Sequence, residues 1–103
     1  MNTEAFAATM NRRDQITEGE LEQIRARLQK FTQLMERELI ENSHKGPCTE
    51  WANMSGIELR NEILYHVAKA AFASKEGNRE LLQEFLVDVA NCALICLESE
   101  GLL

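Results

Sequence analysis

The sequence lacks the features that mark several large classes of protein. No apolar run approaches the ~20 residues that a membrane-spanning helix requires, and no basic segment followed by an apolar one opens the chain as in a signal peptide. We therefore expect no membrane span and a cytoplasmic location. It also contains no Gly-rich phosphate loop, no G-x-S-x-G elbow and no H-E-x-x-H zinc motif. These absences remove the common signatures of nucleotide-binding, hydrolase and metalloprotease sites.

Basic residues are outnumbered: 11 Lys and Arg stand against 17 Asp and Glu, which gives a formal net charge of −6. A protein that binds nucleic acid through the phosphate backbone normally carries a basic stripe, so we expect no nucleic-acid partner. The three cysteines, Cys48, Cys92 and Cys96, form no C-x-x-C pair and suit a reducing compartment. Cys92 and Cys96 lie one helical turn apart. A soft-metal site and two small buried hydrophobes both remain open, and the second is favoured.

What is present is the composition of one helical domain. The chain has 103 residues, 45% of them hydrophobic, and a single proline. A domain of this size buries only roughly two-thirds of its unfolded surface. Oligomerisation would therefore stabilise it considerably.

Hydrophobic spacing and helix-start signals predict three principal helices. Residues 1–16 show no convincing period, and we interpret them as an N-terminal arm, either mobile or a short packed helix. Thr17 and Glu20 form a capping box that begins a helix ending near Glu41. A single domain is predicted over residues 17–103. The apolar positions of the first principal helix recur every three or four residues and predict one buried stripe: Leu21, Ile24, Leu28, Phe31, Met35 and Leu39.

The other two helices follow a loop over residues 42–53. Ser55 and Glu58 form a second capping box, and that helix is expected to end near Ser74. Asn78 is the expected cap of the third helix and Gly101 its expected end. The third helix is apolar around much of its circumference, so it must be covered on several sides. We therefore predict an all-α fold in which three helices form an antiparallel bundle, completed by homodimerisation.

Two stretches of the sequence resemble one protein family. Asn42-Ser-His-Lys-Gly, followed by Trp51 and Met54-Ser55, is similar to the loop before the second helix of short MazG-like proteins, many of them from phages. Glu84-Phe-Leu-Val-Asp-Val-Ala-Asn91 is similar to the Glu-Glu-Leu-x-Asp-Val-Ala-Asn segment of the same family. Together these stretches extend the resemblance over roughly residues 39–103.

The resemblance implies an all-α enzyme that hydrolyses a nucleoside triphosphate to a monophosphate and pyrophosphate. Members hold Mg²⁺ with a Glu-Glu-x-x-Glu motif on one helix and a Glu-x-x-Asp motif on the next. Carboxylates suit this task because Mg²⁺ prefers hard oxygen ligands.

Most of these positions have lost their carboxylates in this chain. Tyr65 and His66 stand at the Glu-Glu pair, Lys69 at the third Glu and Phe85 at the Glu of the second motif, whereas Asp88 remains. In an alternative register Glu58 and Glu62 would face Glu84 and Asp88. Asp88 and Glu84 are therefore the metal-ligand candidates, for Mg²⁺ if the chain is an enzyme.

The substitutions suggest how the degenerate site is filled. We expect Lys69 to pair with Asp88, and Phe85 to pack into the former metal space. His66 is a candidate metal ligand or general base, although a packed histidine is favoured. The resemblance makes Asn91 a candidate ligand-binding residue, and His44 and Lys45 candidates to bind a phosphate, although a solvated loop is equally open. Trp51 is a candidate anchor for a partner, although packing of the loop onto the second helix is favoured.

Three functional hypotheses follow. The first is a catalytically degenerate MazG-like protein that binds a protein or a nucleotide; the phage origin of many similar proteins extends it to a host-interference or anti-defence role. The second is an active Mg²⁺-dependent pyrophosphohydrolase with a displaced metal site. The third is a structural helical subunit of a larger complex.

Overall fold

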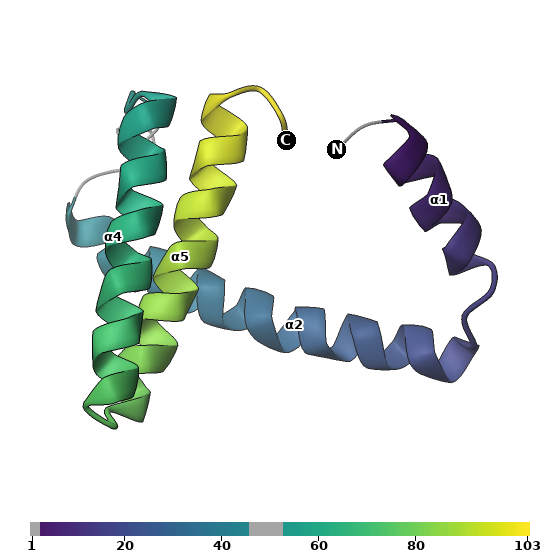
Figure 1. Cartoon of the computed structure of the whole chain (residues 1–103). Helices are drawn as coiled ribbons and strands as arrows, with labels where there is room; N and C mark the ends of the chain where they lie inside the picture. Colours follow the sequence, from purple (N-terminus) through teal and green to yellow (C-terminus); the bar gives the residue numbers. More distant parts are fainter. Residues whose placement is uncertain (1–2, 46–52) are drawn as a thin grey trace. The chain divides into compact units, whose positions relative to one another are not determined.

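The computed structural model describes residues 3–45 and 53–103, and this part of the chain is helical without a strand (Figure 1). The all-α class is therefore confirmed for the described residues, in which no helix is long and apolar enough to cross a membrane. In chain order the elements are α1 (Thr3–Arg13), α2 (Glu18–Glu41), the 3₁₀ helix η1 (Asn42–Lys45), α4 (Gly56–Lys75) and α5 (Arg79–Ser99).

The chain divides into two compact units, Met1–Lys30 and Phe31–Leu103, with the boundary inside α2. The first unit contains α1 and the beginning of α2, joined by a turn in which the Gln15 N–H donates to the Arg12 carbonyl at 2.9 Å. A regular helix therefore occupies most of the segment that the sequence marked as an arm. The division at residue 16 itself stays a prediction.

The predicted helix starts are confirmed by their caps. The Thr17 hydroxyl accepts from the Glu20 N–H at 3.1 Å, and the Glu20 carboxylate accepts from the Thr17 N–H at 3.3 Å. The Ser55 hydroxyl accepts from the Glu58 N–H at 3.2 Å at the start of α4. The Asn78 side chain accepts from the Leu81 N–H at 3.1 Å at the start of α5. Each cap satisfies an amide that the helix leaves without a partner.

A three-residue reversal joins α4 to α5. Gly77 adopts φ +71°, a left-handed conformation that costs a glycine little. Its N–H donates to the Ser74 carbonyl at 3.1 Å, while the Asn78 N–H donates to the Ala73 carbonyl at 2.9 Å. This pair of bonds closes the end of α4. The two helices consequently run antiparallel, side by side (Figure 1). Gly101, at φ +70°, ends α5 in the same way, as predicted.

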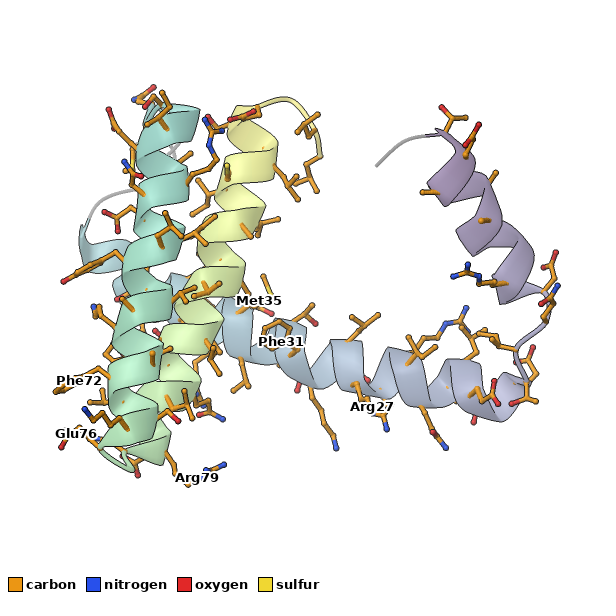
Figure 2. All side chains as sticks on the ribbon, in the orientation of Figure 1. Arg27, Phe31, Met35, Phe72, Glu76 and Arg79 are labelled. Carbon is orange, nitrogen blue, oxygen red and sulfur yellow. The ribbon has the colours of Figure 1, made fainter. Side chains whose placement is uncertain are left out.

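The apolar core lies between α4 and α5. Its most buried members are few and mostly small, which allows the two helices to approach closely: Leu59, Ala70, Ala73 and Val87. The last turns of α2 belong to the same unit, because the Asn91 side-chain amide donates to the Met35 carbonyl at 3.1 Å; Figure 2 labels Met35 on α2. A three-helix bundle that includes the whole of α2 stays a prediction.

The apolar stripe of α2 is buried over only part of its length, contrary to the prediction. Ile24 and Leu28 are 43% and 57% exposed, whereas Met35 and Leu39 are half-buried and Glu38 is buried. The difference arises because the α4–α5 pair supplies partners to the last turns of α2, within the second unit.

Candidate functional site

A cavity of about 400 Å³ lies in the second unit, among the end of α2, α4 and α5. Its walls combine apolar side chains with an unusual concentration of polar ones. The apolar lining consists of Leu39, Met54, Leu59, Cys92 and Ile95. The polar lining consists of Glu38, Asn42, Glu62, His66, Asp88 and Asn91.

Glu38 is the buried acid of this cavity. It is 8% exposed, and the Asn42 side-chain amide donates to its carboxylate at 3.4 Å. Burial raises the pKa of Glu38, and the negative charges of Asp88, Glu84 and Glu41 raise it further, against a smaller opposing effect of Arg37. Burial is the main cause, and the acidic neighbours that add to it make the cavity a negative environment, in which another anion would be unfavourable.

His66 stands between two acids. Its Nε2 lies 3.6 Å from a Glu62 carboxylate oxygen one turn earlier on α4, and its Nδ1 lies 3.8 Å from a carboxylate oxygen of Asp88 on α5. Both distances exceed those of a hydrogen bond. Nδ1 is buried and has no hydrogen-bond partner. The structure therefore brings Glu62, His66 and Asp88 to one cavity wall without linking them tightly.

Asn91 contributes a second unsatisfied atom. The residue is 6% exposed. Its amide nitrogen donates to the Met35 carbonyl, but its Oδ1 has no hydrogen-bond partner. Buried polar atoms are paired in the great majority of cases, because leaving one unpaired costs about 1–3 kcal/mol. An orphaned carbonyl oxygen in a cavity wall therefore marks a position where a donor from a ligand would be stabilising.

The other residues that the resemblance aligns with metal ligands lie around a different cavity, of about 680 Å³. Tyr65, Lys69 and Phe85 line it together, with the Lys69 ammonium 4.9 Å from the Tyr65 ring centroid and 4.6 Å from that of Phe85. We expected Lys69 to pair with Asp88. The structure instead places Lys69 over the two rings, where cation–π attraction holds it, and gives the position facing Asp88 to His66.

The alternative register of the metal site stays a prediction. Glu62 and Asp88 both line the first cavity, whereas Glu84 does not and is exposed. The Glu58 N–H serves the cap of α4. Within residues 3–45 and 53–103, no group of three or more His, Cys, Asp or Glu side chains is placed to hold a metal ion. Of the predicted pair, Asp88 is the one that could contribute an oxygen ligand within the cavity.

The remaining candidates divide between described and undescribed positions. Asn91, predicted to contact a ligand, lines the first cavity. Trp51 and the side chains of His44 and Lys45 lie outside the described part of the structure. Burial raises the pKa of the Cys92 thiol to about 11, with added contributions from Glu62 and Asp88. The thiol is therefore protonated at neutral pH, which suits a small hydrophobe better than a soft-metal ligand.

Glu38 is the site residue that sequence reasoning missed. It follows Met35 by three residues and precedes Leu39, so it belongs to the stripe of α2 that turns toward the core. A carboxylate within an apolar stripe was the signal available in the sequence.

Glu38→Gln is expected to stabilise the protein at neutral pH by about 1 kcal/mol. An acid whose pKa is raised on folding contributes stability at low pH, and this contribution is lost as the pH rises through the raised value. The advantage of the variant over the parent should therefore grow between about pH 4 and pH 7. Urea unfolding at both pH values measures it.

Glu36→Gln is the matched control, because Glu36 is exposed on the same helix. It should change the free energy of unfolding by less than about 0.5 kcal/mol at either pH. A Glu38→Gln variant that is less stable than the parent at pH 7 would contradict the negative environment assigned to the cavity.

Comparisons with protein-family models, with curated proteins and with solved structures find no match for this chain. The MazG-like resemblance therefore stays a prediction from the residues quoted above.

Proposed function

We propose that this chain is a catalytically degenerate MazG-like protein that acts by binding, and that the acidic cavity is its binding site. A partner protein is favoured over a nucleotide as the ligand. The proposal rests on the resemblance in the loop and in α5, and on the chemistry of the side chains that the fold gathers in the second unit.

The observation that carries the loss of catalysis is the cluster of Lys69, Tyr65 and Phe85. These three residues stand where the resemblance would require carboxylates, and they form a cation–π arrangement with separations of 4.6 and 4.9 Å. A cation at this place repels Mg²⁺, and the two rings provide no oxygen ligand from their faces. Metal-dependent hydrolysis by the usual residues is therefore disfavoured.

The charge of the first cavity favours a protein over a free triphosphate. Glu38, Glu62 and Asp88 line it, and the pKa of Glu38 is raised first by burial and further by its acidic neighbours. A triphosphate would add further negative charge to this group. A partner that brings a positive or neutral hydrogen-bond donor would relieve the same repulsion.

One observation favours the active enzyme as a second candidate. Glu62 and Asp88 approach the same histidine from two helices, at 3.6 and 3.8 Å. Small side-chain rotations could direct both carboxylates to one divalent cation, which a bound nucleotide would help to hold.

Pyrophosphate release distinguishes the two candidates. We expect no release above the protein-free background when the chain is incubated with Mg²⁺ and each standard ribonucleoside or deoxyribonucleoside triphosphate. Titration calorimetry with Mg²⁺ or Mn²⁺ and a non-hydrolysable nucleotide should likewise show no saturable heat. Magnesium-dependent release that disappears in Asp88→Asn would establish the enzyme and end the proposal of a degenerate site.

The binding proposal also has a positive test. Co-purification should identify one defined protein whose association, once reconstituted from purified components, is lost in Asp88→Asn. Glu98→Gln removes a charge from an exposed position of the same helix and should leave the association unchanged. A complex insensitive to Asp88→Asn would place the binding surface elsewhere, as the structural-subunit hypothesis requires.

We propose that a homodimer completes the fold, as the apolar circumference of the third predicted helix suggested. The support is the number of large apolar side chains left exposed on α4, including Ile57, Leu64 and Phe72, each 66% exposed. Sedimentation equilibrium tests this directly. A single monomeric species at every concentration examined would contradict the dimer and leave the binding proposal intact.

A further inference from the structure

The acidic cavity carries an indication of its ligand beyond its charge. Asn91 lines the cavity and is 94% buried, and its Oδ1 is buried without a hydrogen-bond partner. An amide oxygen has no charge and cannot donate, so a ligand satisfies it only by offering a donor. The carboxylates of Glu38, Glu62 and Asp88 line the same space and also accept hydrogen bonds. The complementary ligand is therefore a cation that donates several hydrogen bonds in different directions.

The shape of the cavity selects among such cations. At about 400 Å³ it is much larger than a bare ion needs, and it falls in the range of sites that hold organic groups. Its apolar wall, which includes Leu39, Leu59 and Ile95, suits a short hydrocarbon stem. A guanidinium group offers five N–H donors in a fixed plane, whereas an ammonium offers three around one point. Several acceptors on three helices match the first geometry better.

We propose that the cavity binds a guanidinium group, supplied by an arginine side chain of a partner protein. Its N–H groups donate to Asn91 Oδ1 and to the carboxylates of Glu38 and Asp88, and its stem contacts the apolar wall. Its positive charge also relieves the repulsion among the acids of the cavity. The inference deepens the proposed binding function and rests on it.

The test uses the full chain and small probes of defined charge. N-acetyl-arginine amide is titrated into the isotope-labelled protein, and binding is followed through the NMR signals of the Asn91 side-chain amide and the His66 ring. N-acetyl-citrulline amide is the matched neutral probe, since it carries a carbonyl oxygen where arginine has one of its guanidinium nitrogens. We expect saturable shifts with the arginine probe, with a Kd of about 1 mM for a single side chain. The citrulline probe should bind at least about tenfold more weakly.

Two isosteric variants assign the binding to the cavity. Asp88→Asn and Glu38→Gln each remove one charge and retain the shape, and each should weaken the arginine probe about tenfold. Glu38→Gln provides the measurement if Asp88→Asn fails to fold, because we expect it to be at least as stable as the parent. Glu98→Gln should leave the affinity unchanged. The inference is overturned if the arginine and citrulline probes bind equally, or if Glu98→Gln weakens the arginine probe as much as the two cavity variants do.

Two further measurements ask where the guanidinium comes from and whether the proposed binding function itself holds. Agmatine carries the same group with a second cation in place of the peptide backbone. An agmatine affinity within a few-fold of that of the arginine probe supports a protein side chain as the ligand. Agmatine binding that is at least about tenfold tighter assigns the site to a free guanidinium compound instead. A non-hydrolysable nucleotide with Mg²⁺ forms the last arm. Saturable nucleotide binding without arginine binding overturns the guanidinium inference and retains a binding function; magnesium-dependent pyrophosphate release would overturn the degenerate function itself.

Discussion

Leu59→Ala is expected to lower the free energy of unfolding by about 3 kcal/mol. Leu59 is 2% exposed, the lowest value among the core residues together with Ala73. Replacing its isobutyl side chain with a methyl group loses buried apolar contact and extends the cavity that Leu59 already lines. Urea denaturation followed by circular dichroism measures the loss, and a domain of this size should melt roughly 4–8 °C lower for each kcal/mol.

Leu64→Ala is the control that the chain offers. It makes the same substitution on the same helix, at a side chain that is 66% exposed. In a dilute sample that sediments as a monomer it should cost less than about 0.5 kcal/mol. A Leu59→Ala cost as small as that of Leu64→Ala would show that the core does not lie between α4 and α5. A Leu64→Ala cost that grows with protein concentration would support the proposed dimer.

The fold class and the helix starts could be predicted because each depends on a few neighbouring residues. Thr17, Ser55 and Asn78 each accept from an amide three residues further along, so the signal and its structural effect share one turn of helix. Gly77 and Gly101 end their helices for an equally local reason, since both adopt positive φ. Periodicity and capping therefore recovered these elements.

The acidic cavity could be predicted only in part, because it depends on which residues of different helices meet. The resemblance led to Asp88 and Asn91 on α5, and both line the cavity. It placed Lys69 beside Asp88, but the structure gives that place to His66, three residues earlier on α4. Residues three apart differ by only about 60° around the helix axis, so a modest rotation of α4 changes which side chain faces Asp88. No property of a single helix fixes that rotation.

Glu38 illustrates a further limit of prediction from the sequence. Its position in the apolar stripe of α2 was visible, but the stripe is covered only at its end. The burial that raises the pKa of Glu38 arises where the last turns of α2 contact α5. The resulting site combines a destabilising charge with a cavity that accepts donors. Loss of stability in return for a binding site is common in proteins, and Glu38→Gln is expected to gain stability while losing affinity for a guanidinium probe.

Asn91→Asp is expected to lower the free energy of unfolding at neutral pH by about 3 kcal/mol. The substitution keeps the size of the side chain and replaces its amide nitrogen, which donates to the Met35 carbonyl at 3.1 Å, with a carboxylate oxygen. A carboxylate cannot donate to that carbonyl. It would also be buried beside Glu38 and Asp88, in a cavity whose acids already repel one another.

The pH dependence of this cost identifies its cause. Burial and acidic neighbours favour the protonated form of an aspartic acid at position 91, so its pKa should rise on folding. Such a group stabilises the folded state at low pH, and this stabilisation is lost as the pH increases. The cost of Asn91→Asp should therefore shrink to about 1 kcal/mol near pH 4, where the protonated carboxyl can donate to Met35. Asn61→Asp, at an exposed position of α4, should cost less than about 0.5 kcal/mol at both pH values.

Two results would contradict the role assigned to Asn91. A cost equal to that of Asn61→Asp would mean that position 91 is accessible to water, and the orphaned oxygen would then need no ligand. A cost that is large but independent of pH would mean that the lost bond to Met35, rather than the added charge, accounts for it. The acids that line the cavity would then repel an added negative charge only weakly, and a neutral donor would replace the guanidinium as the expected ligand.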